Sequence, residues 1–271
     1  MNHTFLVALT TVLLSSTIAN AATFEDQVQG ATASIKDSAA AAKKLKELNE
    51  ALLNAAWNGK EGDVVKTLDA GADVNAQSTK DSWTGSTALH LASINGYAKI
   101  VGILLARKAD INAVDKSGTT ALHRAVSHGN GDLLAIVKSL LAANANVNAR
   151  DELGMTPLHY ATHFGYSTDA VKLLIATKGI NINAKNDDDA TALHLGAKNG
   201  FYDNQPHSMS HFADIVRILL DSPNIEVNEK NRQGQTPLTL ARLTSSEYPV
   251  YPHVTPSDSI IQMLSKAGAV Q

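Results

Sequence analysis

The chain of 271 residues contains no cysteine, and aromatic residues make up only 5% of it. The absence of cysteine excludes disulfide bonds, thiolate metal sites and cysteine nucleophiles. Hydrophobic residues still reach 44%, so a core has to be built mainly from Ala, Leu, Ile and Val. The net charge of −3, from 23 basic and 26 acidic residues, gives no reason to expect nucleic acid as a partner.

The N-terminus has the pattern of a cleavable signal peptide. Its apolar run from Phe5 to Ile18 has 14 residues, too few to span a bilayer comfortably. The small-x-small sequence Ala19-Asn20-Ala21 follows, so we expect residues 1–21 to be removed and the mature protein to be periplasmic or secreted. The leading residues contain no Lys or Arg, and an uncleaved anchor or a buried first helix is the alternative.

Two further features bear on this expectation. The one N-glycosylation sequon, at Asn2, lies inside the segment to be removed, which slightly favours a bacterial origin. No later run is long and apolar enough to span a membrane, so we expect no membrane contact after cleavage.

One short motif recurs along the chain at a nearly constant interval. Its Thr stands at positions 87, 120, 156, 191 and 236, so the spacings are 33, 36, 35 and 45 residues. A second apolar segment follows each copy, with Val and Leu at the three- and four-residue spacings of an amphipathic helix. Repetition at such a period indicates stacked helical pairs. The copies read TALHLASING, TALHRAVSHG, TPLHYATHFG, TALHLGAKNG and TPLTLARLTS.

These copies resemble the ankyrin repeat family. They share T-[AP]-L-H, a Gly about nine residues after the Thr, an I-V-x-x-L-L second helix and A-D-[VI]-N before the next turn. The resemblance covers residues 49–270 and implies an all-α ankyrin-repeat solenoid of stacked helix–turn–helix units with hairpin tips. No unit buries its apolar faces alone, so the units must stack. We expect six units, counting degenerate caps, at residues 49–76, 85–113, 118–149, 154–184, 189–229 and 234–270.

Local residue chemistry agrees with this organisation. Each Thr of the motif stands where a helix N-cap is wanted. Segments such as Asp115-Lys116-Ser117-Gly118 suit a hairpin tip, whereas Ala190 replaces the usual Gly of its tip and leaves the turn geometry there open. The first helices are expected to end at glycines in the left-handed conformation, at Gly59, Gly96, Gly129, Gly165 and Gly200.

Three segments depart from the repeat. Residues 201–212 and 245–256 are expected to be insertions between the two helices of the last two units, and the second contains three prolines. Residues 22–48 are alanine-rich and polar. We expect a helix from about Ser34 that runs into or shields the first unit, and a partly disordered tether is the alternative.

Histidines are the first candidates for chemistry. His90, His123, His159 and His194 match the His of the motif, and the resemblance implies that they join each tip to the next unit. Zinc needs three or four ligands, and no Glu follows His159 as it does in H-E-x-x-H. We therefore assign His159 to the framework and His163, four residues later, to the surface.

A metal-dependent enzyme is the alternative of a different class. His207 and His211 lie in the 201–212 insertion, with Asp203 and Asp214 nearby, but two histidines are not a zinc shell and a solvated loop is preferred. The acidic run at 186–189 lacks the ligand spacing of a calcium loop. No phosphate loop or serine hydrolase signature appears, so we expect no enzyme activity, metal or cofactor.

The resemblance implies that another protein binds the tips and the exposed face of the first helices. We therefore expect a non-catalytic protein-protein interaction scaffold, and an effector delivered to a host cell is the alternative. Several of the candidate residues are apolar at sites that the fold does not need, as interface anchors are. For Trp83 and Phe164, packing within the array is the alternative. The candidates are Trp83, Ile94, Asn95, Lys116, Ser117, His128, Leu153, Met155, His163, Phe164, Asp188, Lys198 and Arg232.

Overall fold

The computed structural model describes residues 29, 36–80, 83–199, 209–247 and 256–270. The chain divides into an N-terminal segment, Met1–Leu48, and a repeat domain, Asn49–Gln271. In the N-terminal segment, residues 36–48 are helical and most of their side chains are exposed. The expected signal peptide lies outside the described residues. None of the helices that the structure describes combines the length and the apolar character needed to cross a membrane.

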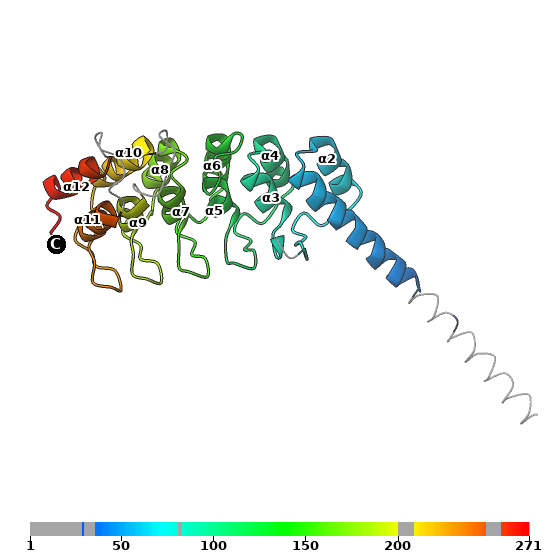
Figure 1. The fold of residues 1–271 in the computed structure, drawn as a ribbon. Coiled ribbons are helices and arrows are strands. Elements are labelled where there is room, and N and C mark those ends of the chain that lie inside the picture. The colour runs from blue at the N-terminus through cyan, green and yellow to red at the C-terminus, as the bar shows by residue number, and fades with distance from the viewer. Residues whose placement is uncertain (1–28, 30–35, 81–82, 200–208, 248–255, 271) are drawn as a thin grey trace, which may run out of the picture. The chain divides into compact units, whose positions relative to one another are not determined.

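The repeat domain is a stack of helix pairs, and hairpin tips extend from one edge of the stack (Figure 1). Helical residues 49–57 and α2 (Glu61–Asp69) form the first pair. In each later pair the first helix follows the Thr of the motif, and the second helix leads into the next tip. This arrangement confirms the expected all-α solenoid. The later pairs are α3 (Ala88–Ile94) with α4 (Ala98–Ala106), α5 (Ala121–Val126) with α6 (Leu133–Ala142), α7 (Pro157–Phe164) with α8 (Thr168–Ala176), α9 (Ala192–Asn199) with α10 (Met209–Leu220), and α11 (Pro237–Glu247) with α12 (Pro256–Lys266).

The first helices bury most of their length, except towards their C-terminal ends, because neighbouring pairs cover them. In α3 every residue from Ala88 to Ile94 is buried. This helix packs against α4 of its own pair and against α5 of the next pair. The second helices bury one face only, as α4 does through Ile100, Val101 and Leu104. The difference explains why the first segments of the repeat are rich in small residues and the second segments are amphipathic.

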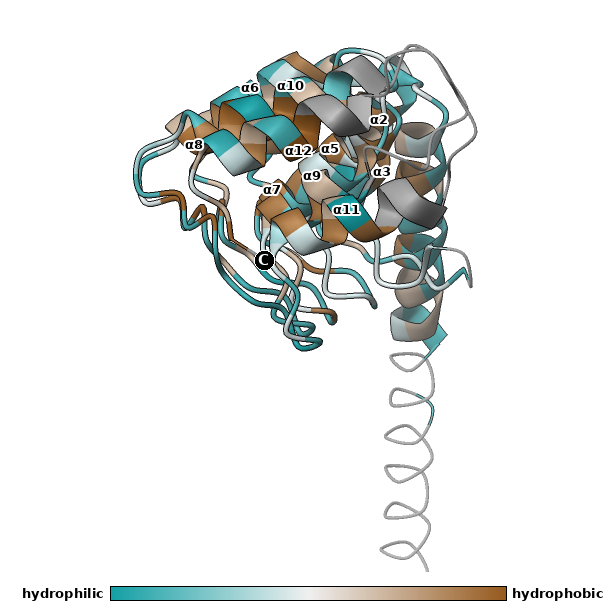
Figure 2. Ribbon diagram, turned by 60° about the vertical axis from the view of Figure 1, so that its left-hand side comes forward, coloured by the Kyte–Doolittle hydropathy of each residue, from teal (hydrophilic) through white to brown (hydrophobic). Residues whose placement is uncertain are grey.

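A continuous apolar core runs through the repeat domain, because each interface between pairs buries the same positions. Leu89, Leu122, Leu158 and Leu193 share one position of the motif, and each is at most 1% exposed. Figure 2 shows the apolar faces of the helices turned towards one another and mostly polar tips. Burying one Leu side chain stabilises a fold by about 1.5–3 kcal/mol. The stability of this domain therefore comes from stacking, as in other repeat arrays.

A ladder of asparagine side chains joins successive repeats. Oδ1 of Asn75 accepts a hydrogen bond from the backbone N–H of Asp110 at 2.7 Å, and Oδ1 of Asn112 accepts one from Asn146 at 2.9 Å. The Asn of A-D-[VI]-N is therefore a framework residue, a role that only its recurrence in the sequence hinted at. The same contact recurs from Asn49 to Asp73, Asn148 to Asn181, Asn183 to Glu226, and Asn228 to Val270.

The last two pairs are more helical than the sequence indicated. Helix α10 begins at Met209, so residues 209–212 of the expected first insertion are helical. Helix α11 ends at Glu247, so residues 245–247 of the expected second insertion are helical too. Pro256 opens α12, a position where a missing N–H costs little. The remaining residues of both insertions lie outside the described part of the chain.

One glycine does not behave as expected. Helix α5 ends at Val126, and Ser127 caps it with a right-handed φ of −87°. The connection to α6 is long, and Gly131, with φ of 53°, takes the left-handed turn in place of Gly129. Gly200 lies outside the described residues. The glycines that do adopt the left-handed conformation at the ends of first helices are Gly59, Gly96 and Gly165, with φ of 70°, 78° and 67°.

The last repeat departs from the pattern because Thr239 replaces the His of the motif. Oγ1 of Thr236 donates to the carbonyl oxygen of Val270 at 2.9 Å and lies 3.0 Å from Oγ1 of Thr239. The polar contacts of this repeat therefore turn back to its own C-terminal residues instead of reaching a following tip.

Candidate partner-binding surface

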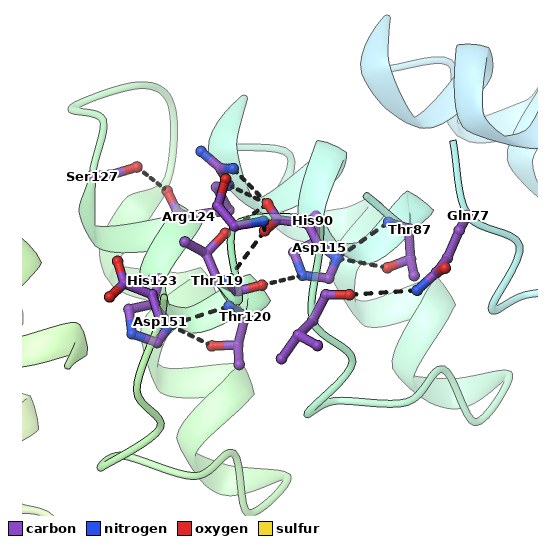
Figure 3. Close-up of polar contacts among 12 residues, drawn as sticks. Gln77, Thr87, His90, Asp115, Thr119, Thr120, His123, Arg124, Ser127 and Asp151 are labelled. Carbon is purple, nitrogen blue, oxygen red and sulfur yellow. Dashed lines mark hydrogen bonds and ion pairs between the residues drawn. The ribbon is translucent and has the colours of Figure 1, made fainter. Parts of the chain in front are cut away.

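In the first four copies of the motif, the Thr and the His cap the N-terminus of the first helix. The backbone N–H of Thr87 donates to Nδ1 of His90 at 3.2 Å. Nε2 of His90 lies 2.9 Å from the carbonyl oxygen of Thr119, in the next tip (Figure 3). Because Nδ1 accepts and a carbonyl oxygen has no proton to give, the imidazole proton is on Nε2. Each such histidine therefore ties the start of one helix to the following tip.

This contact recurs at the next three interfaces. Burial lowers the pKa of all four histidines, and for His123 the value falls to about 4. The four imidazoles are neutral at pH 7 and both ring nitrogens are engaged, so they are framework groups and not metal ligands. The structure thus places His159 in the framework and His163 at the surface. The Nε2-to-carbonyl distances are 3.1 Å for His123 to Met155, 3.0 Å for His159 to Ala190, and 3.1 Å for His194 to Gln235.

Carboxylates organise the tips from inside. Oδ1 of Asp115 accepts the backbone N–H of Thr119 at 3.1 Å, and Oδ2 accepts the Thr119 hydroxyl at 2.6 Å and Nε–H of Arg124 at 3.1 Å (Figure 3). Burial raises the pKa of Asp115, but the hydrogen bonds from Thr119 and Arg124 outweigh it, so the net pKa lies below its usual value. In the next tip Asp151 accepts a hydrogen bond from the Tyr160 hydroxyl at 2.8 Å. These carboxylates therefore hold the backbone of the tips in place.

Neighbouring tips are joined by one backbone hydrogen bond each. The donor is always the residue after the first Asp or Asn of the turn, and the acceptor lies in the preceding tip. The tips therefore form a continuous edge with a fixed backbone. The pairs are Lys116 to Thr84 at 3.1 Å, Glu152 to Ser117 at 3.0 Å, Asp187 to Leu153 at 3.0 Å, and Arg232 to Asp188 at 2.8 Å.

The tip at residues 186–190 has the same turn as its neighbours, which answers the question that Ala190 left open. Asp189, and not Ala190, occupies the position of the tip glycine and adopts a φ of 57°. Its N–H donates to the carbonyl of Asn186 at 3.0 Å, and Asn186 N–H donates to Ala190 at 3.0 Å. Asp tolerates the left-handed region better than most residues, because its short side chain can bond locally.

Most of the candidate residues lie at the surface of the repeat domain. Trp83, Asn95 and Met155 are half-buried. Ile94 differs from the expectation, because it is 4% exposed and belongs to the core at the end of α3. The exposed candidates are Lys116, Ser117, His128, Leu153, His163, Phe164, Asp188, Lys198 and Arg232.

Trp83 packs between repeats. Its ring centroid lies 4.6 Å from that of Trp57, and the guanidinium carbon of Arg124 lies 5.9 Å from its centroid. These contacts bring together side chains from the first, second and third repeats. They favour packing, the alternative role for Trp83, over a free anchor.

Phe164 lies at the centre of a cluster of rings that we call the aromatic platform, made of His128, His163, Phe164 and Tyr166. Phe164 and Tyr166 are stacked, with centroids 6.2 Å apart and planes 7° apart. His163 meets Phe164 edge-on at 4.8 Å, and His128 lies 6.5 Å from it. Phe164 is 36% exposed and Tyr166 is 52% exposed. Tyr166 escaped the sequence analysis because it follows the motif glycine, outside the variable positions of the repeat.

The described residues give no support to a metal centre. His211 is exposed on α10, and His207 lies outside the described residues. Within the described part of the chain, no group of three or more His, Asp or Glu side chains is placed to hold a metal ion.

Comparisons with known proteins agree with this geometry. The sequence model described as Ankyrin repeats (3 copies) matches residues 52–151 and 129–204. Alpha-latrotoxin-Lg1a of Latrodectus geometricus is 34% identical over 202 residues, which cover 72% of this chain and 11% of the toxin. The nuclear factor NF-kappa-B p105 subunit of Gallus gallus is 30% identical over 156 residues, 57% of this chain and 14% of that protein.

A third relative is an enzyme by name. Glycerophosphocholine phosphodiesterase gde1 of Schizosaccharomyces pombe is 40% identical over 81 residues, 30% of this chain and 7% of that protein. The chain thus spans only a small fraction of the length of these relatives, and what it shares with them is the repeat. The matched region takes in more than half of the chain, together with the Thr–His framework, the hydrogen-bonded tips and the stacked pairs. The chain therefore belongs to the ankyrin repeat family.

Proposed function

We propose that this protein is a non-catalytic scaffold that binds another protein through its tips and the exposed ends of its first helices. Ankyrin repeats generally mediate protein–protein interaction. The observation that carries the proposal is that the recurring polar side chains are bonded within the array, whereas some apolar side chains are exposed. The Thr, His, Asn and tip carboxylates are used inside the array, whereas apolar side chains at Leu153 and Phe164 face solvent, with 67% and 36% exposure.

Exposed apolar groups of this kind are typical interface anchors. Leu153 stands at the outer end of a tip whose backbone is held by hydrogen bonds on both sides, through Asp187 and Glu152. A rigid edge with an apolar side chain binds with a small loss of conformational entropy. The whole activities of the relatives are not carried over, because this chain matches only 11–14% of the length of the first two.

Site-specific photo-crosslinking tests the proposal. A photoreactive amino acid at Leu153 is expected to crosslink a defined protein in the native cell. The matched control is the same residue at Lys138, which is exposed on α6, a second helix. Two results would contradict the proposed surface: crosslinking of the same protein with equal yield at both positions, and no crosslinking at either position.

We further propose that the mature chain works outside the cytoplasm, after cleavage behind Ala21. The pattern of residues 1–21 supports this, and the N-terminal sequence of the native protein tests it. A mature N-terminus at Ala22 with recovery from the periplasm favours a scaffold there, and recovery from a host cell favours the effector role. An intact Met1 would contradict export by this route.

A further inference from the structure

The first helices beside the aromatic platform carry basic and no acidic side chains. The first helices α3, α5, α7 and α9 contain no Asp or Glu, whereas α5 carries Arg124 and α9 carries Lys198. Arg124 is the charged group that acts on His128, and Lys198 is the one that acts on His163. Arg124 is paired with Asp115, so Lys198, which is exposed on α9, supplies the cation beside the platform.

Cations near helix C-termini have a structural explanation of their own, because they offset the helix dipole. That explanation does not extend to Phe164 and Tyr166, which remain partly exposed after folding. These two rings are also held in place. Tyr166 lies against Gly129, where an added Cβ would come within 3.0 Å of its ring, and its plane is parallel to that of Phe164.

A fixed apolar surface beside an exposed lysine matches a ligand that carries carboxylates next to apolar side chains. We propose that the aromatic platform, with Lys198, binds an acidic segment of the partner protein in which carboxylates alternate with aromatic or large aliphatic residues. This inference rests on the proposed scaffold function and adds the chemistry of the partner. The platform supplies ring contacts, and Lys198 supplies charge complementarity.

The tips argue against a long polyanion such as nucleic acid as the occupant. The tips that precede α7 and α9 expose Glu152, Asp188 and Asp189, and an extended chain of phosphates that ran from the platform to these tips would meet like charge. A short acidic segment confined to the ends of α5, α7 and α9 avoids this repulsion.

Fluorescence anisotropy with short labelled peptides tests the inference on the full-length mature chain. The probe alternates Glu with Phe and Leu, and its two comparisons replace every Glu by Lys or every apolar residue by Ser. We expect the first peptide to bind at least about tenfold more tightly than either comparison, and to weaken as salt rises. Equal binding of the lysine peptide, or no binding of the acidic one, would overturn the inference.

Variants locate the site. Phe164→Ala and Lys198→Glu are each expected to weaken the acidic peptide about tenfold, with a circular dichroism melting curve close to that of the wild type. Lys138→Glu makes the same charge change on α6 and is expected to leave affinity unchanged. An equal loss in Lys138→Glu, or displacement of the peptide by single-stranded oligothymidylate, would overturn the inference. A specific crosslink at Leu153 would still support the scaffold function in that event, so the two failures are distinguishable.

Discussion

At the scale of single residues, the buried histidines carry the most information about this molecule. Each accepts a hydrogen bond at Nδ1 and donates one from Nε2 to the next repeat, as His123 does to the carbonyl oxygen of Met155. Such an arrangement needs a neutral ring, and burial enforces neutrality by lowering the pKa. The same side chain therefore links stability to pH.

Stability is expected to fall as the pH drops below about 6.5, the usual pKa of histidine. The unfolded chain binds protons there and the folded chain does not, so the contribution is complete above pH 6.5 and is lost towards the folded pKa. For His123 the shift from 6.5 to about 4 corresponds to about 3 kcal/mol. Urea unfolding followed by circular dichroism between about pH 7.5 and about pH 4.5 measures the loss.

His123→Gln provides the control for this prediction. The variant is expected to be less stable than the wild type at pH 7.5. Because glutamine does not titrate, the variant is expected to lose less further stability on acidification than the wild type does. Parallel curves for the two proteins would show that His123 does not contribute to the pH dependence.

At the scale of an element, the tips depend on left-handed residues that touch the next repeat. Gly118 has φ of 73°, and a Cβ there would lie 2.9 Å from the backbone nitrogen of Glu152. That nitrogen donates the hydrogen bond that joins this tip to the next one. A side chain at Gly118 therefore strains the backbone of that residue and displaces the hydrogen bond between the two tips.

Gly118→Ala is expected to destabilise the repeat domain by about 1–2 kcal/mol or more, since an L-residue resists this conformation and the contact is with backbone. Gly102→Ala is the matched control, because Gly102 lies within α4 and nothing stands within 4 Å of an added Cβ. Alanine there is expected to stabilise the helix by up to about 1 kcal/mol. Thermal unfolding of both variants measures these effects. Melting temperatures that shift in the same direction in both variants would contradict the proposed role of Gly118 in the tip.

At the scale of the whole repeat domain, stability is shared between neighbours. An inner repeat has a partner on each side, and the last one has a partner on one side only. Leu140 of α6 and Leu264 of α12 are both fully buried, so the same truncation has different consequences at the two places.

Leu140→Ala and Leu264→Ala are each expected to cost about 2–5 kcal/mol locally. At Leu140 the loss weakens both flanking interfaces and is expected to speed amide exchange across α3 to α8. At Leu264 faster exchange is expected only in α11 and α12, because the rest of the stack keeps its contacts. Hydrogen exchange with mass spectrometry measures the pattern, and uniform acceleration in the Leu264→Ala variant would contradict nearest-neighbour stability.

Much of this molecule was predictable because its determinants are local. Thr caps, glycine turns and the apolar periods of two helices act within a few residues, and their repetition led to the solenoid and to the structural role of His159. Even the replacement of a tip glycine by Asp189 left the turn intact, because hydrogen bonds from the adjacent tips hold it.

What the sequence by itself determined was the repeat: where each helix pair and each tip begins, and which residues form the framework. Only the tertiary structure decided which of the remaining side chains reach solvent. Ile94 is buried, Trp83 packs on Trp57 and Arg124, and Tyr166 joins Phe164 at the surface. The physical reason is that exposure depends on contacts with side chains of the neighbouring repeat and on the length of each connection, which the local sequence does not specify.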